Sequence, residues 1–190
     1  MSKVSIKKIN GTIKDTLSET LDLIGGVLNF VSPDDRVMLK PNINGVDCTN
    51  IELVEALIQI LLENNVKNIF IGESTFGNKH ITEKFFNETG YRALAQKYNI
   101  DIVNLNASEI IDVKVNNPLI AETIKFAKDV FEVDKIINIP VMKVHYATGV
   151  TLSLKNLKGL LAPSEKRRFH EIGLDKAIVD LNNSVTTHLN

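Results

Sequence analysis

Basic, hydroxyl and amide side chains are concentrated between residues 136 and 159, in the stretch IINIPVMKVHYATGVTLSLKNLKG. No aspartate or glutamate occurs between Asp134 and Glu165. Ammonium, hydroxyl and amide groups are the donors that bind carboxylate and phosphate groups. The stretch therefore predicts a binding site for a small phosphate- or carboxylate-bearing ligand, without identifying the ligand or a reaction. The candidate ligand-binding residues in it are Lys143, Thr151, Ser153, Lys155, Asn156 and Lys158.

Two backbone conformations are compatible with the second half of this stretch. The apolar residues recur at helical spacing, and Thr148 as N-cap and Gly159 after the last turn favour a helix. Alternation of apolar residues over 150–154 also fits a strand. Thr151 and Lys155 share one side in both conformations, with Lys158 in the helix or Ser153 in the strand. A helix would add free N–H groups and a positive dipole end near Thr148, which attract anions.

Two shorter stretches place polar side chains at the ends of predicted strands. Pro41 fixes the backbone and ends a strand, so Lys40 and Asn42 are held at a strand end. Gly72-Glu73-Ser74-Thr75 offers N–H groups, hydroxyls and a carboxylate, and Ser74 is its candidate ligand-binding residue. Both stretches also fit an ordinary strand end or turn. The chain contains neither GxxxxGK[ST] nor GxGxxG, so the common nucleotide-binding fingerprints are absent.

Three titratable residues are candidates for acid–base catalysis, namely His145, His170 and Glu73. They could also bind a metal, but their wide separation does not match a metal-ligand spacing. Cys48 is more typical of a small buried side chain than of a nucleophile. The sequence leaves both catalysis and metal binding open.

Alternating strand and helix patterns predict the elements that would hold these residues. We expect strands over 4–9, 36–40, 66–71, 100–104 and 135–139, helices over 14–30, 49–63, 91–98 and 174–181, and a hairpin over 111–126. A further helix is expected after residue 82. This order predicts a three-layer α/β fold, in which a mostly parallel sheet carries helices on both faces. Ligands bind outside the carboxyl ends of such strands, and three of these ends carry the candidate residues.

Composition restricts the class of protein. The 190 residues are 44% hydrophobic and 24% charged, which is ordinary for a globular chain, and we read them as one domain. The single cysteine, Cys48, excludes an internal disulfide and an iron–sulfur cluster held by four cysteines of this chain. The N-terminus has no signal-peptide pattern and no apolar run reaches membrane-spanning length, so we expect a cytoplasmic protein.

The charges are unevenly distributed along the chain. Residues 135–168 hold seven lysines and arginines against one acid, whereas the whole chain has a net charge of −1. Such a local positive field favours a small anion over a broad nucleic-acid footprint, although a solvated basic face is the plainer reading. Aromatic residues for stacking on bases are few there, so nucleic-acid binding is the least favoured alternative.

These residues lie in motifs that resemble the DUF362 proteins, a prokaryotic family of unknown function. The matching segments are VMLKPNI (37–43), IGES (71–74), FFNETGY (85–91), IINIPVMKVH (136–145), VTLSLKNLKGL (150–160) and GLDKAIVDL (173–181), together with His170. The resemblance covers about residues 36 to 182. One departure is Val144, where the family usually has a threonine between lysine and histidine. The resemblance implies the fold and the candidate site, but no reaction.

Two further expectations follow from the resemblance alone. Family members typically continue past Asp180-Leu181 with a strand-rich segment, so this chain resembles a domain that lacks its C-terminal part. Many relatives carry a ferredoxin-like module with two four-iron clusters, which this chain cannot hold. The resemblance therefore implies, as the alternative to an anion-binding domain or enzyme, an accessory domain that works beside a ferredoxin-like iron–sulfur protein.

Overall fold

A parallel sheet of four strands forms the centre of the computed structural model, which describes residues 3–45 and 47–190. The strand order is β3-β2-β1-β6. The strands are β1 (Val37–Pro41), β2 (Ile69–Glu73), β3 (Asp101–Asn104) and β6 (Lys135–Ile139). β1 and β2 are buried along their whole length, as expected of strands that are covered on both faces.

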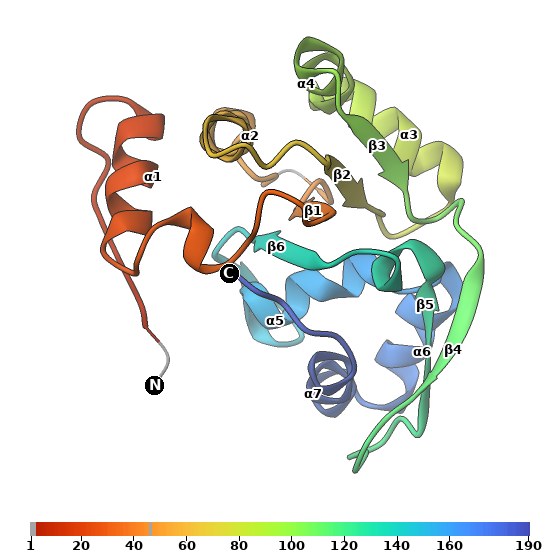
Figure 1. Ribbon diagram of the computed structural model, residues 1–190. Helices are drawn as coiled ribbons and strands as arrows, with labels where there is room; N and C mark the ends of the chain where they lie inside the picture. The colour runs from red at the N-terminus through yellow and green to blue at the C-terminus, as the bar shows by residue number, and fades with distance from the viewer. Residues whose placement is uncertain (1–2, 46) are drawn as a thin grey trace.

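Helices lie on both sides of the sheet (Figure 1), and a hydrophobic cluster packs on each of its two faces. Side chains alternate along a strand, so Val37 and Leu39 of β1 join one cluster and Met38 joins the other. The first face is covered by α1 (Ile13–Asp22), η1 (Val27–Asn29), α2 (Ile51–Glu63), α3 (Lys79–Glu88) and α4 (Tyr91–Tyr98). The second face is covered by β4 (Ile110–Lys114), β5 (Thr123–Ala127), η2 (Lys128–Phe131), α5 (Ser153–Asn156), η3 (Leu157–Leu160), α6 (Pro163–Ile172) and α7 (Leu174–Ser184). The predicted three-layer α/β fold is confirmed.

The N-terminal region differs from the prediction at two places. Residues 3–10 form no strand, and Val4 and Ile6 are 83% and 87% exposed because no neighbouring strand pairs with them. The helix predicted to reach residue 30 ends at Asp22. Gly25 and Gly26 follow it with φ values of 107° and 79°, which are incompatible with a continuous right-handed helix.

The start of α2 also corrects a predicted cap. Asn50, not Thr49, is the N-cap, and its side chain accepts a hydrogen bond from the N–H of Glu52. The Thr49 hydroxyl instead accepts from the N–H of Asn42 at 2.8 Å and donates to the carbonyl of Ile139 at 2.7 Å. Thr49 thereby ties the end of β1 to the end of β6, next to the predicted site.

The stretch around Thr148 is a β-hairpin rather than the start of a helix. β7 (Lys143–His145) pairs in antiparallel fashion with β8 (Gly149–Thr151), and α5 begins only at Ser153. The Thr148 hydroxyl lies 3.2 Å from His145 Nδ1 and donates to the carbonyl of Val150. The prediction of a helix dipole at Thr148 was wrong, because Thr148 stabilises a turn that reverses the chain.

Asn138 of β6 connects the centre of the sheet to the predicted site. Its N–H donates to the carbonyl of Leu189, where the end of the chain runs parallel to β6. Its side-chain amide donates to Asn190 Oδ1, and its Oδ1 accepts from Asn156 Nδ2 at 2.8 Å. Asn156 in turn donates to the carbonyl of Lys40 at 3.3 Å. The position of Asn156 is therefore fixed by two strands of the sheet.

Candidate functional site

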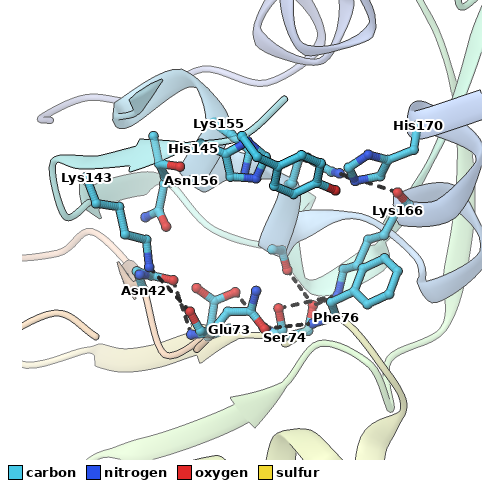
Figure 2. A pocket seen from close by; sticks show the side chains of 15 residues that line it. Asn42, Glu73, Ser74, Phe76, Lys143, His145, Lys155, Asn156, Lys166 and His170 are labelled. Carbon is cyan, nitrogen blue, oxygen red and sulfur yellow. Dashed lines mark hydrogen bonds between the residues drawn. The ribbon is translucent and has the colours of Figure 1, made fainter. Parts of the chain in front are cut away.

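The carboxyl ends of all four parallel strands lie at one edge of the sheet, as predicted. In the sheet register, Pro41 is the partner of Ile139 and Glu73 is the partner of Asn104. The segments that follow these strands therefore emerge side by side. A cavity of about 350 Å³ opens at this edge (Figure 2). Its lining residues are Asn42, Asn44, Glu73, Ser74, Phe76, Lys143, His145, Tyr146, Thr151, Lys155, Asn156, Lys158, Gly159, Lys166 and His170.

Four lysines line the cavity against a single carboxylate, Glu73. Burial, with a smaller effect of the Lys155 charge, lowers the pKa of Lys158 to about 8. Burial also lowers the pKa of Lys155, and the charge of Lys143 acts in the same direction. Desolvated ammonium groups that repel one another gain free energy when an anion enters between them. The electrostatics of the cavity therefore favour a negatively charged ligand.

Lys166 of α6 reaches back to the ends of β2 and β3. Its ammonium donates to the carbonyl of Thr75 at 2.9 Å, to Asn106 Oδ1 at 3.0 Å and to the hydroxyl of Ser74. Burial lowers the pKa of Lys166 to about 7. Every acceptor around its Nζ is an oxygen, so the ammonium form satisfies these contacts whereas a neutral amine would turn a lone pair toward one of them. In its ammonium form, Lys166 thus holds α6 against the sheet edge.

Lys158 and His170 form a direct contact across the cavity, with 2.9 Å between Nζ and Nε2. The ammonium has only donors, so Nε2 of the histidine accepts and the ring proton lies on Nδ1. Burial lowers the pKa of His170, and the charges of Lys158 and Lys155 lower it further. The neutral imidazole and its lysine are therefore a hydrogen-bonded pair that can pass a proton.

His145 presents its other nitrogen to the cavity. Nδ1 accepts from the N–H groups of Ala147 and Thr148 at 3.2 and 3.3 Å, so the proton of the neutral ring lies on Nε2. Burial lowers the pKa of His145, and neighbouring positive charges, led by that of Lys155, act in the same direction. The ring stacks on Tyr146 at 4.7 Å between centroids. His145 is arranged to donate a hydrogen bond to a ligand.

Lys40 does not line the cavity, in contrast to the prediction. It is fully buried beneath the cavity, where its ammonium donates to Glu73 Oε2 and to the carbonyl of Pro41. Burial lowers the pKa of Lys40 and raises that of Glu73, and each charge opposes the shift of the other. The other oxygen of Glu73 accepts from the N–H of Ser74 at 2.6 Å. Lys40 therefore neutralises the only carboxylate of the lining.

Gly159 lies directly against this ion pair. A Cβ atom at this position would lie 1.8 Å from Glu73 Oε1 and 2.8 Å from Lys40 Nζ. The carbonyl of Gly159 accepts from the hydroxyl of Ser74 at 2.6 Å. The absence of a side chain thus lets η3 approach the ends of β1 and β2 closely.

One hydroxyl in the lining is left without a partner. Thr151 is 6% exposed, and its Oγ1 makes no hydrogen bond to any residue that the structure describes. Lys155 Nζ likewise donates to none of the described residues. An unpaired buried hydroxyl costs free energy, which a bound acceptor would recover. Lys155 therefore offers donors for a ligand, whereas the Thr151 hydroxyl is an unpaired group buried in the cavity wall.

Most of the predicted ligand-binding and catalytic residues lie at the cavity. They are Asn42, Glu73, Ser74, Lys143, His145, Thr151, Lys155, Asn156, Lys158 and His170. Ser153 is an exception, because β8 ends at Thr151 and the first turn of α5 directs the chain away; its carbonyl accepts from Asn138 Nδ2. The amide of Asn42 is also used internally, since it donates to the carbonyl of Asp47 at 2.9 Å.

Sequence reasoning missed Lys166, Asn106 and the two aromatic residues at the cavity. α6 was not predicted, although Pro163 at its first turn and Glu165 behind it are typical of a helix start. That signal would have placed Lys166 and His170 four residues apart on one face. Phe76 and Tyr146 carry no sequence signal, because exposed aromatic residues are common in loops.

The described residues contain no group of three or more histidine, cysteine, aspartate or glutamate side chains that could hold a metal ion. The ring lone pairs of His145 and His170 already accept hydrogen bonds. Around the cavity, the donor set matches an anion better than a cation. None of the helices in the described part of the chain is long and apolar enough to cross a membrane.

Comparison with known proteins identifies related sequences. The profile of the family described as "Domain of unknown function (DUF362)" matches residues 37–190. A thylakoid-associated protein of Synechocystis sp. is 33% identical over 175 residues, which cover 87% of this chain and 51% of that protein. The chain therefore spans about half the length of this relative. The family profile begins to match at the first residue of β1, and the matched region includes the ends of all the strands that border the site.

Proposed function

The chain belongs to the DUF362 family, whose function is unknown, and from its site we propose that it binds a small polyanion bearing two or more phosphate or carboxylate groups. The observation that carries the proposal is the convergence of Lys143, Lys155, Lys158 and Lys166 on one cavity whose only carboxylate is paired with Lys40. A single monovalent anion would leave several of these charges uncompensated. Two or more anionic groups match the number of cations.

Some donors at the cavity already make hydrogen bonds to protein oxygens and others do not, so we give them different roles in ligand binding. Lys166 is held by protein oxygens, and Lys143 donates to the carbonyl of Asp47 at 2.9 Å. Lys155 and Thr151 are without partners among the described residues, and Nε2 of His145 carries a proton. We assign direct ligand contacts to Lys155 and His145. Lys166 and Lys143 contribute the surrounding positive potential.

The ligand class is limited by shape as well as charge. A cavity of about 350 Å³ is the size of a small metabolite. The basic side chains of 135–168 that converge here are gathered into a hollow rather than spread over a face. This arrangement supports a compact anion in preference to an extended nucleic acid, for which basic residues follow the phosphate backbone.

Ligand-dependent thermal stability tests the proposal. Pyrophosphate and citrate should raise the Tm at millimolar concentration, sulfate as a single dianionic group should raise it less, and acetate at equal ionic strength should not raise it. Lys155→Met should abolish most of the shift, and Lys176→Met, which removes an exposed lysine of α7, should retain it. Equal shifts in both variants, or stabilisation by acetate as strong as by citrate, would refute a polyanion site.

Catalysis on the bound anion is a second candidate, favoured by the contact between Lys158 and His170. An acid–base group works best when its pKa lies near the working pH, and the pKa of Lys158 is about 8. The pair is suited to removing a proton next to a carboxylate that the other lysines bind. Deuterium incorporation into malate or citrate in D₂O, absent with Lys158→Met, would support a reaction. Its absence with every stabilising carboxylate would leave a binding protein.

The cellular setting and the partner are further proposals. We propose a cytoplasmic location, which suits a chain with a single cysteine. Cell fractionation tests this location. An iron–sulfur partner rests on the family resemblance alone, and co-purification of a cluster-bearing ferredoxin would support it.

A further inference from the structure

The hairpin formed by β7 and β8 carries different chemistry on its two faces. The register pairs Lys143 with Thr151, Val144 with Val150 and His145 with Gly149. Lys143, His145 and Thr151 line the cavity. Because successive side chains point to opposite faces of a strand, the valine pair points away from the cavity.

The outer face of the hairpin is apolar and exposed. Val144 is 89% exposed and Met142 before it is 80% exposed, while Tyr146 after it is 90% exposed and also borders the cavity. Val150 and Leu152 continue the surface on the other strand. We call these five residues the hairpin patch. A cluster of large apolar side chains that projects so far into water is unusual unless another surface covers it.

The charges next to the hairpin patch indicate the chemistry of that surface. Lys143 and Lys155 lie beside it at the cavity, and the chain has no acid from residue 135 to residue 164. Residues 135–168 are strongly positive, whereas the remainder of the chain is negative. The local positive charge beside the hairpin patch favours an anionic surface as its partner.

We propose that the hairpin patch docks on an anionic lipid bilayer. The patch projects from the molecule, so it requires no matching groove, and a bilayer surface accommodates such side chains without one. Tyr146 has an apolar ring and a polar tip, which suits the boundary between headgroups and acyl chains. The outer edges of a two-stranded hairpin still need hydrogen bonds, so insertion stays at headgroup depth. Neighbouring lysines then pair with lipid phosphates.

Vesicle binding tests this proposal independently of the polyanion site. The intact chain should sediment with phosphatidylcholine vesicles containing phosphatidylglycerol and remain in solution with phosphatidylcholine alone. The double substitution Val144→Asp and Val150→Asp should weaken vesicle binding by at least about tenfold. It removes two valines that the bilayer would bury and adds two negative charges that the anionic lipids repel. Leu28→Asp alters an exposed residue of η1, before the amino end of β1, and should bind as the parent does.

A spectroscopic probe separates insertion from simple charge attraction. The chain has no tryptophan, so Val144→Trp introduces a single reporter at an exposed position outside the cavity lining. Its emission should shift to shorter wavelength with anionic vesicles, and Lys158→Met, which alters the polyanion site away from the hairpin patch, should leave sedimentation unchanged. Unshifted emission, or equal sedimentation of the double variant with a parent-like circular dichroism spectrum, would overturn the proposal. Dimerisation that the double variant abolishes, without vesicle binding, would assign the patch to a second copy instead.

Discussion

Gly159 occupies a position from which a side chain would collide with the buried carboxylate of Glu73. A Cβ atom there would lie 1.8 Å from Glu73 Oε1, and the carboxylate cannot easily retreat because Lys40 and the N–H of Ser74 hold it. The glycine, the ion pair and the floor of the cavity therefore form one unit. We therefore expect a substitution in any part of this unit to change both the stability of the fold and the affinity for a ligand.

Gly159→Ala should destabilise the fold by about 1–3 kcal/mol, the usual cost of overpacking. Urea unfolding measures this change. In a Lys40→Met/Glu73→Ala background, most of the colliding atoms are absent and the added cost of the alanine should shrink. An equal cost in both backgrounds would show that the collision with the ion pair is not its cause.

Removing one member of the buried ion pair should cost more than removing both. Glu73→Ala leaves the ammonium of Lys40 buried without its counter-charge, which typically costs about 3–5 kcal/mol. Lys40→Met combined with Glu73→Leu removes both charges and should recover part of that loss. Chemical denaturation of the three proteins tests the order. A double variant less stable than Glu73→Ala would contradict it.

Sulfate affinity should fall as pH rises from 6 to 9. The free site contains Lys166 with a pKa of about 7 and Lys158 with a pKa of about 8, and both bind an anion as ammonium groups. Their protons are present below pH 7 and are lost as pH passes through these values, so the Kd should rise by up to about tenfold per pH unit for each lysine that must be reprotonated. Calorimetric titration measures it.

Sulfate is the suitable probe because it remains a dianion over this range, unlike phosphate. Lys158→Met should bind more weakly at pH 6.5 and lose the part of the pH dependence above 7.5. A pH-independent affinity of the parent would remove the two lysines from the binding site.

Outside the site, we expect the hydrogen bonds of Asp180 to make the stability of the fold sensitive to acid. Its buried carboxylate accepts from the N–H groups of Leu119, Ile120 and Ala121 at 2.7, 2.9 and 2.8 Å. These bonds hold its pKa below the usual range despite burial. The stabilisation is therefore complete above the ordinary aspartate pKa and is lost as pH falls through the lowered one.

Asp180→Asn should cost roughly 2–3 kcal/mol at pH 7, because an amide N–H₂ replaces one accepting oxygen. Asp175→Asn, an exposed change on the same helix, should cost less than 1 kcal/mol. The difference between the two variants should narrow toward pH 3. A constant difference would mean that the carboxylate charge is not involved.

The buried strands could be predicted from the sequence because their apolar patterns fit a parallel sheet covered on both faces. β1 and β6 are short apolar runs that end at a proline, which suits strands buried on both faces. The polar residues that follow them, Asn42 and Lys143, meet at the carboxyl edge of the parallel sheet. The site was therefore predictable at the level of strand ends. Lys40 was misplaced because burial of a lysine depends on its partner, and Glu73 lies 33 positions away in sequence.

The hairpin was not predictable from local pattern alone. Residues 150–154 fit both helical and strand spacing, and Thr148, which favoured the helix as a cap, is also a good turn residue. The hairpin is stabilised over the helix by the contact of the Thr148 hydroxyl with His145 and by the pairing of Lys143 with Thr151. Both interactions require the turn to exist first, so neither is visible in the order of residues.

The two faces of β7 share one three-residue backbone. A shift of Val144 toward an external surface necessarily moves Lys143 and His145, which line the cavity. Two binding events that meet on so short a strand are thermodynamically linked. Whatever factor an outer contact applies to the affinity for the polyanion, the polyanion must apply the same factor to that contact. Binding of a polyanion in the cavity would then change the affinity of the outer face of the hairpin for its partner.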